Sequence, residues 1–307
     1  MQKEDVTQSL EQTVSALSDF SSSGILYAPT HGRSMPSIEA LHEIMGNLRS
    51  ILFPGYFGKS RITSQNLPHY IGVNVDKTFH LLAEQIARGI CFAQIENKLI
   101  DCDLNDKLAH EITLSFFELL PQIREILISD VKSTYNGDPA ANSFGAIIYS
   151  YPGLKATTNY RIAHALLKLK VPLIPRIITE MAHAETGIDI NPGAKIGGSF
   201  TMDHGTGIVI GETCLIGSNV KLYQGVTLGA KSFPLDDDGN PIKGIPRHPI
   251  VEDNVVIYAQ ATILGRITIG EGSVIGGNVW LTKDVPRKSR ILQTAPLDIG
   301  FSNGLGI

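Results

Sequence analysis

Two histidines in the C-terminal half of the sequence lie among residue types that handle protons and charged substrates. His204 follows Asp203 in the run MDHGTG, His248 follows Arg247 in the run PRHP, and Asp189 precedes the first histidine by fifteen residues. A carboxylate that accepts a hydrogen bond from one imidazole nitrogen fixes the tautomer and leaves the other nitrogen free as a base. Either histidine alone would be an ordinary polar residue. Together, the five residues are typical of a site that deprotonates a weakly acidic nucleophile and binds a charged substrate.

The segment that must position these residues, 188–282, carries an aliphatic residue at every sixth position. The series runs in three frames, namely Ile190, Ile196, Met202 and Ile208, then Ile210, Ile216, Leu222 and Leu228, then Val251, Ile257, Ile263, Ile269, Ile275 and Leu281. A period of six fits neither the helical spacing of about 3.6 residues nor the strand spacing of about 2. It indicates a solenoid of very short strands, in which one aliphatic residue per strand points inward.

The turns of this solenoid are expected at glycines beside the repeat positions. These glycines are Gly197, Gly211, Gly217, Gly265, Gly270 and Gly276. Tight corners would use the positive φ that glycine adopts without steric cost. If a triangular coil of three strands takes about eighteen residues, the chain from Asp189 to His204 returns almost to the same corner one coil later. A hydrogen bond between these two side chains is therefore expected.

Upstream of the repeat, the spacing of apolar residues is helical. Helices are expected over 6–20, 38–53, 75–96, 106–120, 121–137, 154–169 and 173–186. Ser37 is a suitable N-cap, and Pro121 is expected to end one helix and open the next, because proline is tolerated in the first helical turn but not in the interior. Gly187 marks the change of period.

The predicted fold class is α+β, with an N-terminal all-α domain followed by a left-handed parallel β-helix of hexapeptide repeats. The expected parts are an arm over 1–30, the helical domain over 31–186, the β-helix over 187–290 with a loop insertion at 230–249, and a tail over 291–307. A solenoid exposes its end coils, and the helical domain is the natural cap for the first coil. The DDDG in the inserted loop lacks the ligand spacing of a calcium site and is expected to be a solvated turn.

Composition and charge exclude several classes of function. The net charge of −4 gives no basis for binding nucleic acid or an anionic membrane. No apolar run approaches the roughly 20 residues of a membrane span, and the polar start MQKEDVTQSL is not a signal peptide. Cys91, Cys102 and Cys214 are odd in number and widely spaced, which favours a reducing compartment over a disulfide framework or zinc site. A cytoplasmic location is expected.

Several motifs resemble those of one enzyme family. The runs GIDINPGAKIGGSFTMDHGTGIVIGET, YQGVTLGA, GDPAA (137–141) and YRIAHAL (160–166) are similar to those of serine O-acetyltransferases, which make O-acetylserine for cysteine synthesis. Many acyltransferases share the hexapeptide repeat, but its combination with these motifs over roughly 120–290 is specific. The resemblance implies acetyl transfer from acetyl-CoA to the hydroxyl of L-serine by direct attack, with no metal and no permanently bound cofactor.

The resemblance also implies roles for the residues of the reaction centre. His204 would be the general base, Asp189 would orient it, and His248 would position the substrate or polarise the thioester carbonyl. A positioned base contributes roughly 10²- to 10⁴-fold in rate. The groove for CoA would need small residues, for which the candidates are Ala230, Ala259 and Gly277.

The substrate and partners follow from the same resemblance. Asp138 and Asp203 would hold the serine ammonium group, and Arg247, with its planar fork, would hold the carboxylate. L-cysteine would compete for the same pocket as a feedback inhibitor. A tail ending in Ile307 would enter the active site of O-acetylserine sulfhydrylase. The assembly would be a homotrimer or a dimer of trimers, with each active site between neighbouring β-helices.

Three other functions remain open. The acceptor could be a different hydroxylated molecule, such as homoserine or a sugar, although two aspartates and an arginine favour an amino acid. A carbonic-anhydrase-like enzyme would need about three histidines around zinc, and the β-helix offers only His204 and His248. The chain could also be a non-catalytic regulator of the sulfhydrylase, which the intact Asp–His pair argues against. The inserted loop is longer than in the commonest bacterial members, so CoA contacts there are open.

Overall fold

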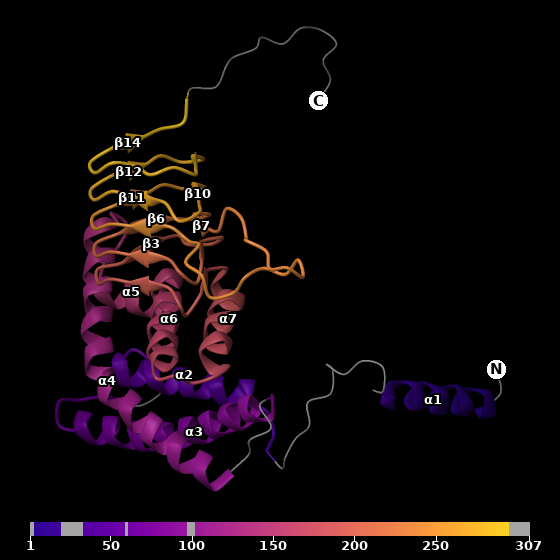
Figure 1. Ribbon diagram of the computed structural model, residues 1–307. Coiled ribbons are helices and arrows are strands. Elements are labelled where there is room, and N and C mark those ends of the chain that lie inside the picture. Colours follow the sequence, from indigo (N-terminus) through magenta and orange to yellow (C-terminus); the bar gives the residue numbers. More distant parts are fainter. Residues whose placement is uncertain (1–2, 20–32, 59–60, 97–101, 295–307) are drawn as a thin grey trace.

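The computed structural model describes residues 3–19, 33–58, 61–96 and 102–294, in which helices precede strands along the chain (Figure 1). The helices in these ranges are α1 (Lys3–Ser18), α2 (Ile38–Leu52), α3 (Leu67–Glu96), α4 (Cys102–Gly137), α5 (Phe144–Ser150), α6 (Pro152–Lys168) and α7 (Ile174–Thr186). None of these described helices is long and apolar enough to cross a membrane.

Polar caps explain where several helices begin. Ser37 caps α2 as expected, by accepting a backbone hydrogen bond in the first turn at 3.1 Å. α3 begins earlier than the expected position near 75, because Thr63 and Asn66 form a reciprocal cap. The N–H of Thr63 donates to Oδ1 of Asn66 at 2.8 Å, and the N–H of Asn66 donates to Oγ1 of Thr63 at 3.3 Å. α5 was not expected, and Ser143 caps it in the same way as Ser37 caps α2.

The expected helix break at Pro121 is wrong. α4 continues through Pro121 without interruption. A proline in a helix costs about 3 kcal/mol, because it removes a backbone hydrogen bond and crowds the preceding turn. Phe116, Leu120, Ile123 and Leu127 on both sides of it are buried in the helical core. Their burial, at about 1.5–3 kcal/mol for each side chain, outweighs the cost of the proline.

After Gly187, which ends α7 with a φ of 69°, the chain winds into a left-handed parallel β-helix with three faces. The first face holds β1 (Asp189–Ile190), β4 (Val209–Ile210), β7 (Thr227–Gly229), β10 (Thr262–Leu264) and β13 (Trp280–Leu281). The second holds β2 (Lys195–Ile196), β5 (Leu215–Ile216), β8 (Ile250–Val251) and β11 (Thr268–Ile269). The third holds β3 (Thr201–Asp203), β6 (Lys221–Tyr223), β9 (Val256–Ile257), β12 (Val274–Ile275) and β14 (Arg290–Ile291).

The residues at six-residue spacing form the core of the β-helix, as predicted. On the first face, Ile190 pairs with Ile210 and Ile210 pairs with Leu228, and all three are buried. Ile196 and Leu281 are the partly buried members of the series. Each coil therefore contributes one aliphatic side chain per face to a continuous apolar column.

The shift between the first two frames has a local cause at one corner. The turn between the third and first faces spans residues 204–208 in the first coil but only 224–226 in the second. The first coil is consequently twenty residues long, from Asp189 to Val209, whereas the second, from Val209 to Thr227, has the expected eighteen. The longer turn is the one that carries His204.

The glycines beside the repeat positions serve a different purpose from the one expected. Of that set only Gly265 has a positive φ, and the corners instead place residues such as Asn219, Asn254 and Asn278 in the left-handed region. A Cβ atom on Gly217 would lie 2.2 Å from Oδ1 of Asp253 in the next coil. These glycines are therefore needed because neighbouring coils approach closely, not because the backbone requires positive φ.

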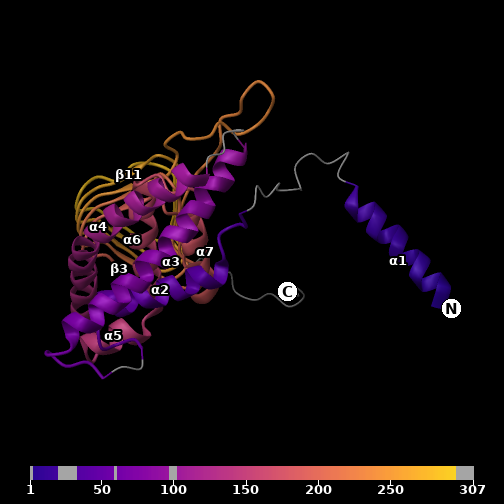
Figure 2. The same cartoon turned by 90° about the horizontal axis from the view of Figure 1, so that it is seen from below.

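The helical domain is joined to the first coil by a buried ion pair between α4 and α6. Nε and Nη2 of Arg161 donate to the Asp130 carboxylate at 2.7 and 2.9 Å. Nη2 also donates to the carbonyl oxygen of Gly197 at 2.8 Å, and the N–H of Phe200 donates to Asp130 at 2.9 Å. α4 and α6 contact β3 and α7 contacts β1, while α2 and α3 lie beyond them (Figures 1 and 2). The helical domain thus covers this end of the β-helix, which is the capping role expected of it.

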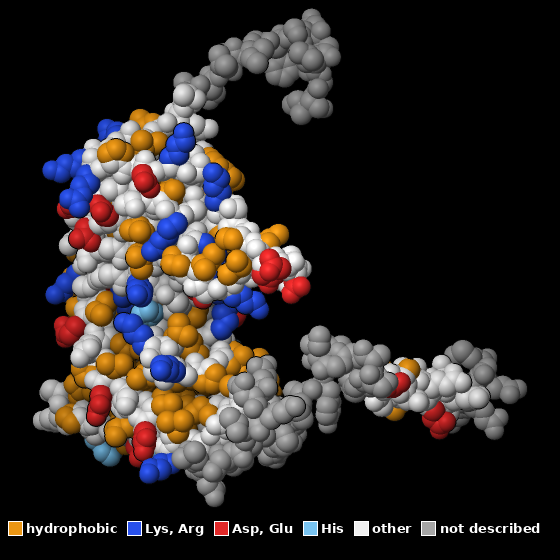
Figure 3. Space-filling view, viewed as in Figure 1, with side chains coloured by type: hydrophobic (Ala, Val, Ile, Leu, Met, Phe, Trp, Pro, Cys, Tyr) orange, Lys and Arg blue, Asp and Glu red, His pale blue; other side chains and the backbone are white. Residues whose placement is uncertain are grey.

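The inserted loop leaves the first face after β7 and returns at β8. Its DDDG segment is a turn in which Oδ1 of Asp236 accepts hydrogen bonds from the N–H groups of Asp238 and Asn240 at 3.1 and 2.8 Å. Acidic side chains gather at the projecting tip in Figure 3, and residues 231–243 are exposed. The expectation of a solvated turn is confirmed, and the loop brings Arg247 and His248 back to the β-helix.

Candidate active site

His204 occupies the longer corner in a backbone conformation that projects its side chain outward. Its φ is 56°, and the next residue, Gly205, has a φ of 86°. A Cβ atom on Gly205 would lie 2.5 Å from Cδ1 of Ile188, so this turn is packed tightly on the previous corner. A non-glycine residue at positive φ is uncommon and costs free energy, and such residues gather at functional sites. The His204 side chain is 75% exposed and is available to a ligand.

Asp203 and Lys221 lie beside His204 on the third face. Nε2 of His204 is 3.7 Å from one oxygen of Asp203, and Nζ of Lys221 is 3.0 Å from the other. Lys221 Nζ also donates to the carbonyl oxygen of Gly137 at 2.8 Å and lies 4.6 Å from the centre of the Tyr223 ring. Burial acts to lower the pKa of Lys221, but Tyr223 and Asp203 outweigh it and the pKa is raised. Lys221 is therefore a fixed cation between the two domains.

Asp138 completes this group from the segment that follows α4. The hydroxyl of Tyr151 donates to Oδ2 of Asp138 at 2.7 Å, and the N–H of Ala140 donates to Oδ1 at 2.8 Å. These two hydrogen bonds, of which the one from Tyr151 has the larger effect, hold the pKa of Asp138 below its usual range. Electrostatic interaction with Lys221 and with His204 lowers it further. Asp138 is thus a carboxylate at neutral pH. We call Asp138, Asp203, His204 and Lys221 the His204 cluster.

Asp189 starts β1, immediately after the corner that precedes the His204 corner by one coil. The two corners touch, since the N–H of Gly207 donates to the carbonyl oxygen of Gly187 at 2.8 Å. In the described part of the chain, no hydrogen bond joins the side chains of Asp189 and His204. The orienting role of Asp189 stays a prediction.

Arg247 and His248 lie at a different corner, between the first and second faces. Nδ1 of His248 accepts a hydrogen bond from the N–H of Thr213 at 3.1 Å and lies 2.8 Å from its Oγ1. Burial, followed by the charge of Arg247, lowers the pKa of His248. The imidazole is therefore neutral, and because Nδ1 is an acceptor, Nε2 carries the proton and is a hydrogen-bond donor. A Cβ atom on Gly211 would lie 2.0 Å from this ring, so glycine is required beneath it.

Arg247 is anchored at its corner by two contacts. Nη2 donates to Oε2 of Glu212 at 2.8 Å, and Nη1 donates to the carbonyl oxygen of Ile245 at 3.4 Å. Nε is buried and has no partner among the described residues. A buried donor without a partner is costly, and an added carboxylate would satisfy it. We call Glu212, Arg247 and His248 the Arg247 cluster.

The three candidate residues for CoA divide between the same two corners. Ala259 and Gly277 stack above the His204 corner, where a Cβ atom on Gly277 would lie 3.1 Å from the carbonyl oxygen of Ala259. Ala230 follows β7 at the corner of the Arg247 cluster. Gly277 therefore has a packing reason to be small, and no hydrogen bond or charge in the described residues distinguishes Ala230 as a ligand contact. Their role in CoA binding stays a prediction.

The structure thus brings together Asp138, Asp203 and His204, and separately Arg247 and His248. Sequence reasoning missed Lys221, Tyr151 and Glu212, which hold these residues in place. Within the described ranges, no three His, Cys, Asp or Glu side chains are arranged as metal ligands. Burial raises the pKa of Cys214 to about 12, so this thiol packs in the core instead of reacting.

Comparison with known proteins is consistent with this arrangement. Residues 248–283 match the family described as bacterial transferase hexapeptide (six repeats), and residues 207–233 match the hexapeptide repeat of succinyl-transferase. A relative from Synechococcus elongatus, a plasmid-encoded serine acetyltransferase, is 49% identical over an alignment 305 residues long that covers 97% of this chain and 95% of that protein.

Solved structures agree over most of the chain. Serine acetyltransferase 1 of Entamoeba histolytica, in complex with L-cysteine, has a TM-score of 0.70 at 33% identity and covers 91% of this chain and 94% of its own. Soybean serine acetyltransferase complexed with serine has a TM-score of 0.54 at 27% identity and covers 84% of this chain and 98% of its own. With near-complete coverage at 49% identity and the same architecture, the chain belongs to the serine acetyltransferase family.

Proposed function

We propose that the protein transfers the acetyl group of acetyl-CoA to the hydroxyl oxygen of L-serine, giving O-acetyl-L-serine and CoA for cysteine synthesis. The observation that carries this proposal is the His204 cluster, in which an exposed imidazole lies beside two aspartates. An amino acid presents its hydroxyl close to its ammonium group, so a base beside two carboxylates suits it. The names of the relatives, which include complexes with serine and with cysteine, support the same substrate class.

In this mechanism His204 removes the proton from the serine hydroxyl as its oxygen attacks the thioester carbonyl carbon. The C–O bond forms, the C–S bond breaks, and the sulfur of CoA receives the proton from His204. Asp189 orients the imidazole, and the Nε2–H of His248 donates to the carbonyl oxygen on which negative charge develops. Holding both substrates in one site supplies much of the remaining acceleration.

Serine is held at both ends. Asp138 and Asp203 receive the ammonium group, and because Lys221 already pairs with Asp203, Asp138 has more capacity for the substrate. Arg247 receives the carboxylate on the part of its guanidinium that Glu212 leaves free. L-cysteine presents the same two charged groups, and we expect it to compete for this pocket.

The two clusters lie at different corners of one β-helix, and this separation supports an active site shared between chains. His204 belongs to the corner between the third and first faces, and Arg247 to the corner between the first and second. A threefold arrangement of β-helices would place the His204 corner of one copy against the Arg247 corner of the next. We propose a homotrimer, alone or paired as a dimer of trimers, with acetyl-CoA bound between copies along Ala259 and Gly277 of one and Ala230 of the other.

The experiment that tests this function is thiol release from acetyl-CoA by the purified full chain. L-serine, D-serine, homoserine and a sugar are offered as acceptors. We expect thiol release that depends on L-serine and is competitively inhibited by L-cysteine. Preference for another acceptor would reject serine as the substrate, and the absence of release with every acceptor would favour a non-catalytic regulator of the sulfhydrylase.

The C-terminal tail carries a separate proposal. Residues 295–307 lie outside the described residues, and they end in Ile307. A terminal carboxylate beside an aliphatic side chain suits a pocket made for an amino-acid-like ligand. We propose that the tail binds O-acetylserine sulfhydrylase in this way. Equal capture of that enzyme by the full chain and by a chain lacking Ile307 would disprove it.

A further inference from the structure

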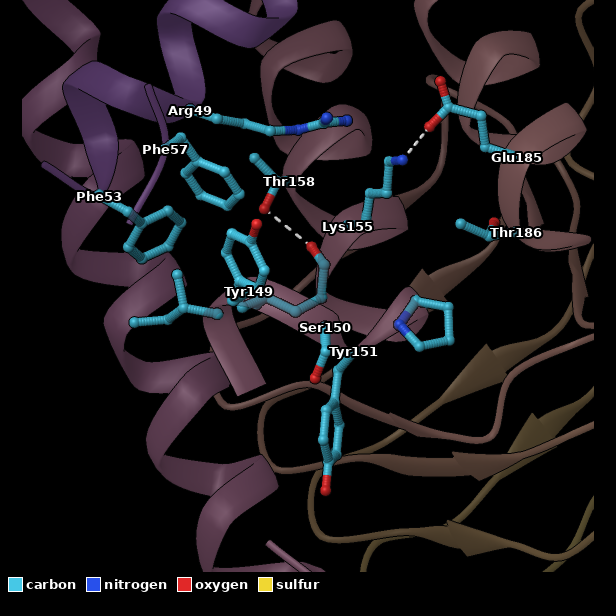
Figure 4. A pocket seen from close by; sticks show the side chains of 13 residues that line it. Arg49, Phe53, Phe57, Tyr149, Ser150, Tyr151, Lys155, Thr158, Glu185 and Thr186 are labelled. Atoms are coloured by element: carbon cyan, nitrogen blue, oxygen red, sulfur yellow. Dashed lines mark hydrogen bonds and ion pairs between the residues drawn. The ribbon is translucent and has the colours of Figure 1, made fainter. Parts of the chain in front are cut away.

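A cavity of about 290 Å³ lies within the helical domain. One of its lining residues is Tyr151, whose hydroxyl group donates to Asp138 of the His204 cluster. It is bounded by α2, α5, α6 and the end of α7, and Figure 4 shows the side chains that line it. The volume is at the lower end of the range for small-molecule pockets. Nothing in the proposed acetyl transfer uses this space.

Arg49 extends along one wall of the cavity without an anionic partner. Its Nη2 donates to the amide oxygen of Asn159 at 2.8 Å, which is a neutral acceptor. Its Nε is buried and has no hydrogen-bond partner in the described residues, and no described carboxylate forms an ion pair with it. Burial lowers the pKa of Arg49, and the charge of Glu185, which is paired with Lys155, opposes this shift only in part. A buried charge in this state is costly, and an anion in the cavity would stabilise it.

The other charged groups of the wall leave one positive charge in excess. Lys155 forms an ion pair with Glu185, and the two side chains point toward each other in Figure 4. This pair is internally balanced. Arg49 is therefore the uncompensated cation, and a ligand with a single negative charge would neutralise the cavity.

The side of the cavity away from the Lys155–Glu185 pair is aromatic. Phe53, Phe57 and Tyr149 lie together in Figure 4, and the rings of Phe57 and Tyr149 stack with their centres 5.9 Å apart. Such a surface takes the flat or aliphatic part of a ligand and not a hydrated ion.

We propose that this cavity binds a small organic monocarboxylic acid, with its carboxylate on Arg49 and its apolar part against Phe53, Phe57 and Tyr149. The site borders the His204 cluster at Tyr151, but it uses none of the residues that we assign to serine or acetyl-CoA contacts. The planar fork of arginine offers two parallel donors to a carboxylate, so the ligand is held in one orientation.

The test uses benzoate as a probe and benzamide as its neutral analogue of the same shape. Binding to the full chain is measured by titration calorimetry at constant ionic strength. We expect benzoate to bind and benzamide to bind at least about tenfold more weakly, the difference expected for a charge-assisted hydrogen bond. Arg49→Gln should weaken the affinity for benzoate by a similar factor. Arg176→Met, which removes an exposed arginine outside the cavity, should leave the affinity for benzoate unchanged.

A second variant keeps the proposal testable if Arg49→Gln fails to fold. Glu185→Gln removes the only carboxylate of the cavity wall among the described residues. It should therefore raise the affinity for benzoate several-fold. Benzoate that does not bind, benzamide that binds equally well, or an affinity unchanged in both Arg49→Gln and Glu185→Gln would overturn the proposal. If Glu185→Gln is the only variant that folds, an affinity for benzoate that is unchanged or weaker in this variant would overturn the proposal.

Discussion

The hydroxyl group of Tyr151 donates a hydrogen bond to Oδ2 of Asp138 at 2.7 Å, and it is the main reason that the pKa of this carboxyl group is depressed. Tyr151 is therefore a positioning residue for the carboxylate that we assign to the serine ammonium. Because Asp138 comes from the segment after α4 and Tyr151 precedes α6, this bond also holds the binding group against the helical domain.

Tyr151→Phe should raise KM for L-serine several-fold to about tenfold with little change in kcat, because it loosens substrate binding and leaves the base in place. Removing the donor lets the pKa of Asp138 rise toward its normal value. Asp138 must be ionised to bind the ammonium group, so the ratio of KM between the variant and the unsubstituted protein should grow as the pH falls toward the ordinary pKa of an aspartate, about 3.9. Tyr149→Phe, on an exposed ring two residues away, is the matched control. A KM ratio in Tyr151→Phe that stays constant as the pH falls would contradict this role.

His204 should be tested by substitution with asparagine. The φ of 56° at this position disfavours most residues, but asparagine adopts it readily, so His204→Asn removes the base and leaves the corner unstrained. We expect kcat to fall by about 10²- to 10⁴-fold. The melting temperature of the variant should match that of the unsubstituted protein. A kcat near that of the unsubstituted protein would remove His204 from the mechanism.

Lys221 should contribute to stability as well as to the site. Its ammonium group joins Asp203 on the third face to the carbonyl oxygen of Gly137 at the end of α4. Lys221→Met should lower the free energy of unfolding by about 1–2 kcal/mol, since it removes charge-assisted hydrogen bonds at a side chain that is only 17% exposed. Urea denaturation at fixed protein concentration measures this. Lys195→Met, on an exposed lysine of β2, should change little, and equal effects in the two variants would count against the contact.

The buried Arg161–Asp130 pair should contribute far more to the free energy of unfolding than Lys221 does. Both side chains are almost fully buried, with 6% and 1% exposure. Arg161→Met leaves Asp130 buried without its cation and should cost about 3–5 kcal/mol of unfolding free energy. Arg176→Met breaks an exposed pair with Glu180 on α7 and should cost at most about 1 kcal/mol. A small effect in Arg161→Met would mean that the other contacts between the first coil and the helical domain hold them together without this ion pair.

The architecture of the β-helix could be predicted because its signal is local and repeated. Apart from Ile208, each residue of the series belongs to a strand of two or three residues, so a period of six is visible without any tertiary information. Pro121 was misjudged because the contacts that keep α4 continuous come from distant helices. The glycines were misread for a related reason. The close approach at Gly217 involves Asp253 in another coil, which spacing along the sequence does not reveal.

The sequence predicted the chemical groups of the candidate site better than it predicted the residues that hold these groups in position. Asp138, Asp203 and His204 were predicted, and they meet in the structure. Lys221 was missed, although the register offers a signal, since Asp203 pairs with Tyr223 and a lysine two residues earlier lies on the same outward face. Tyr151 could not be found in this way, because its contact depends on how the segment before α6 folds back on the end of α4.

The separation of the His204 and Arg247 clusters makes a sharp prediction about mixed assemblies. If each active site takes His204 from one copy and Arg247 from the next, His204→Asn and Arg247→Met should complement each other. In a trimer that contains both chains, two copies of one and one of the other, about one site in three should combine both native residues. Co-expression with two different tags, followed by sequential purification on both, isolates the mixed assemblies, and thiol release is then measured.

The matched control pairs His204→Asn with Asp203→Asn, whose defects lie in the same cluster. No site in that mixture can combine a native Asp203 and a native His204 from one chain, so activity should not exceed the sum of the two parents. Recovery in the first mixture and not in the second would place the active site between chains. If neither mixture recovers while the mixed assemblies form, the active site does not combine His204 of one chain with Arg247 of the next, and the proposed site between chains is rejected.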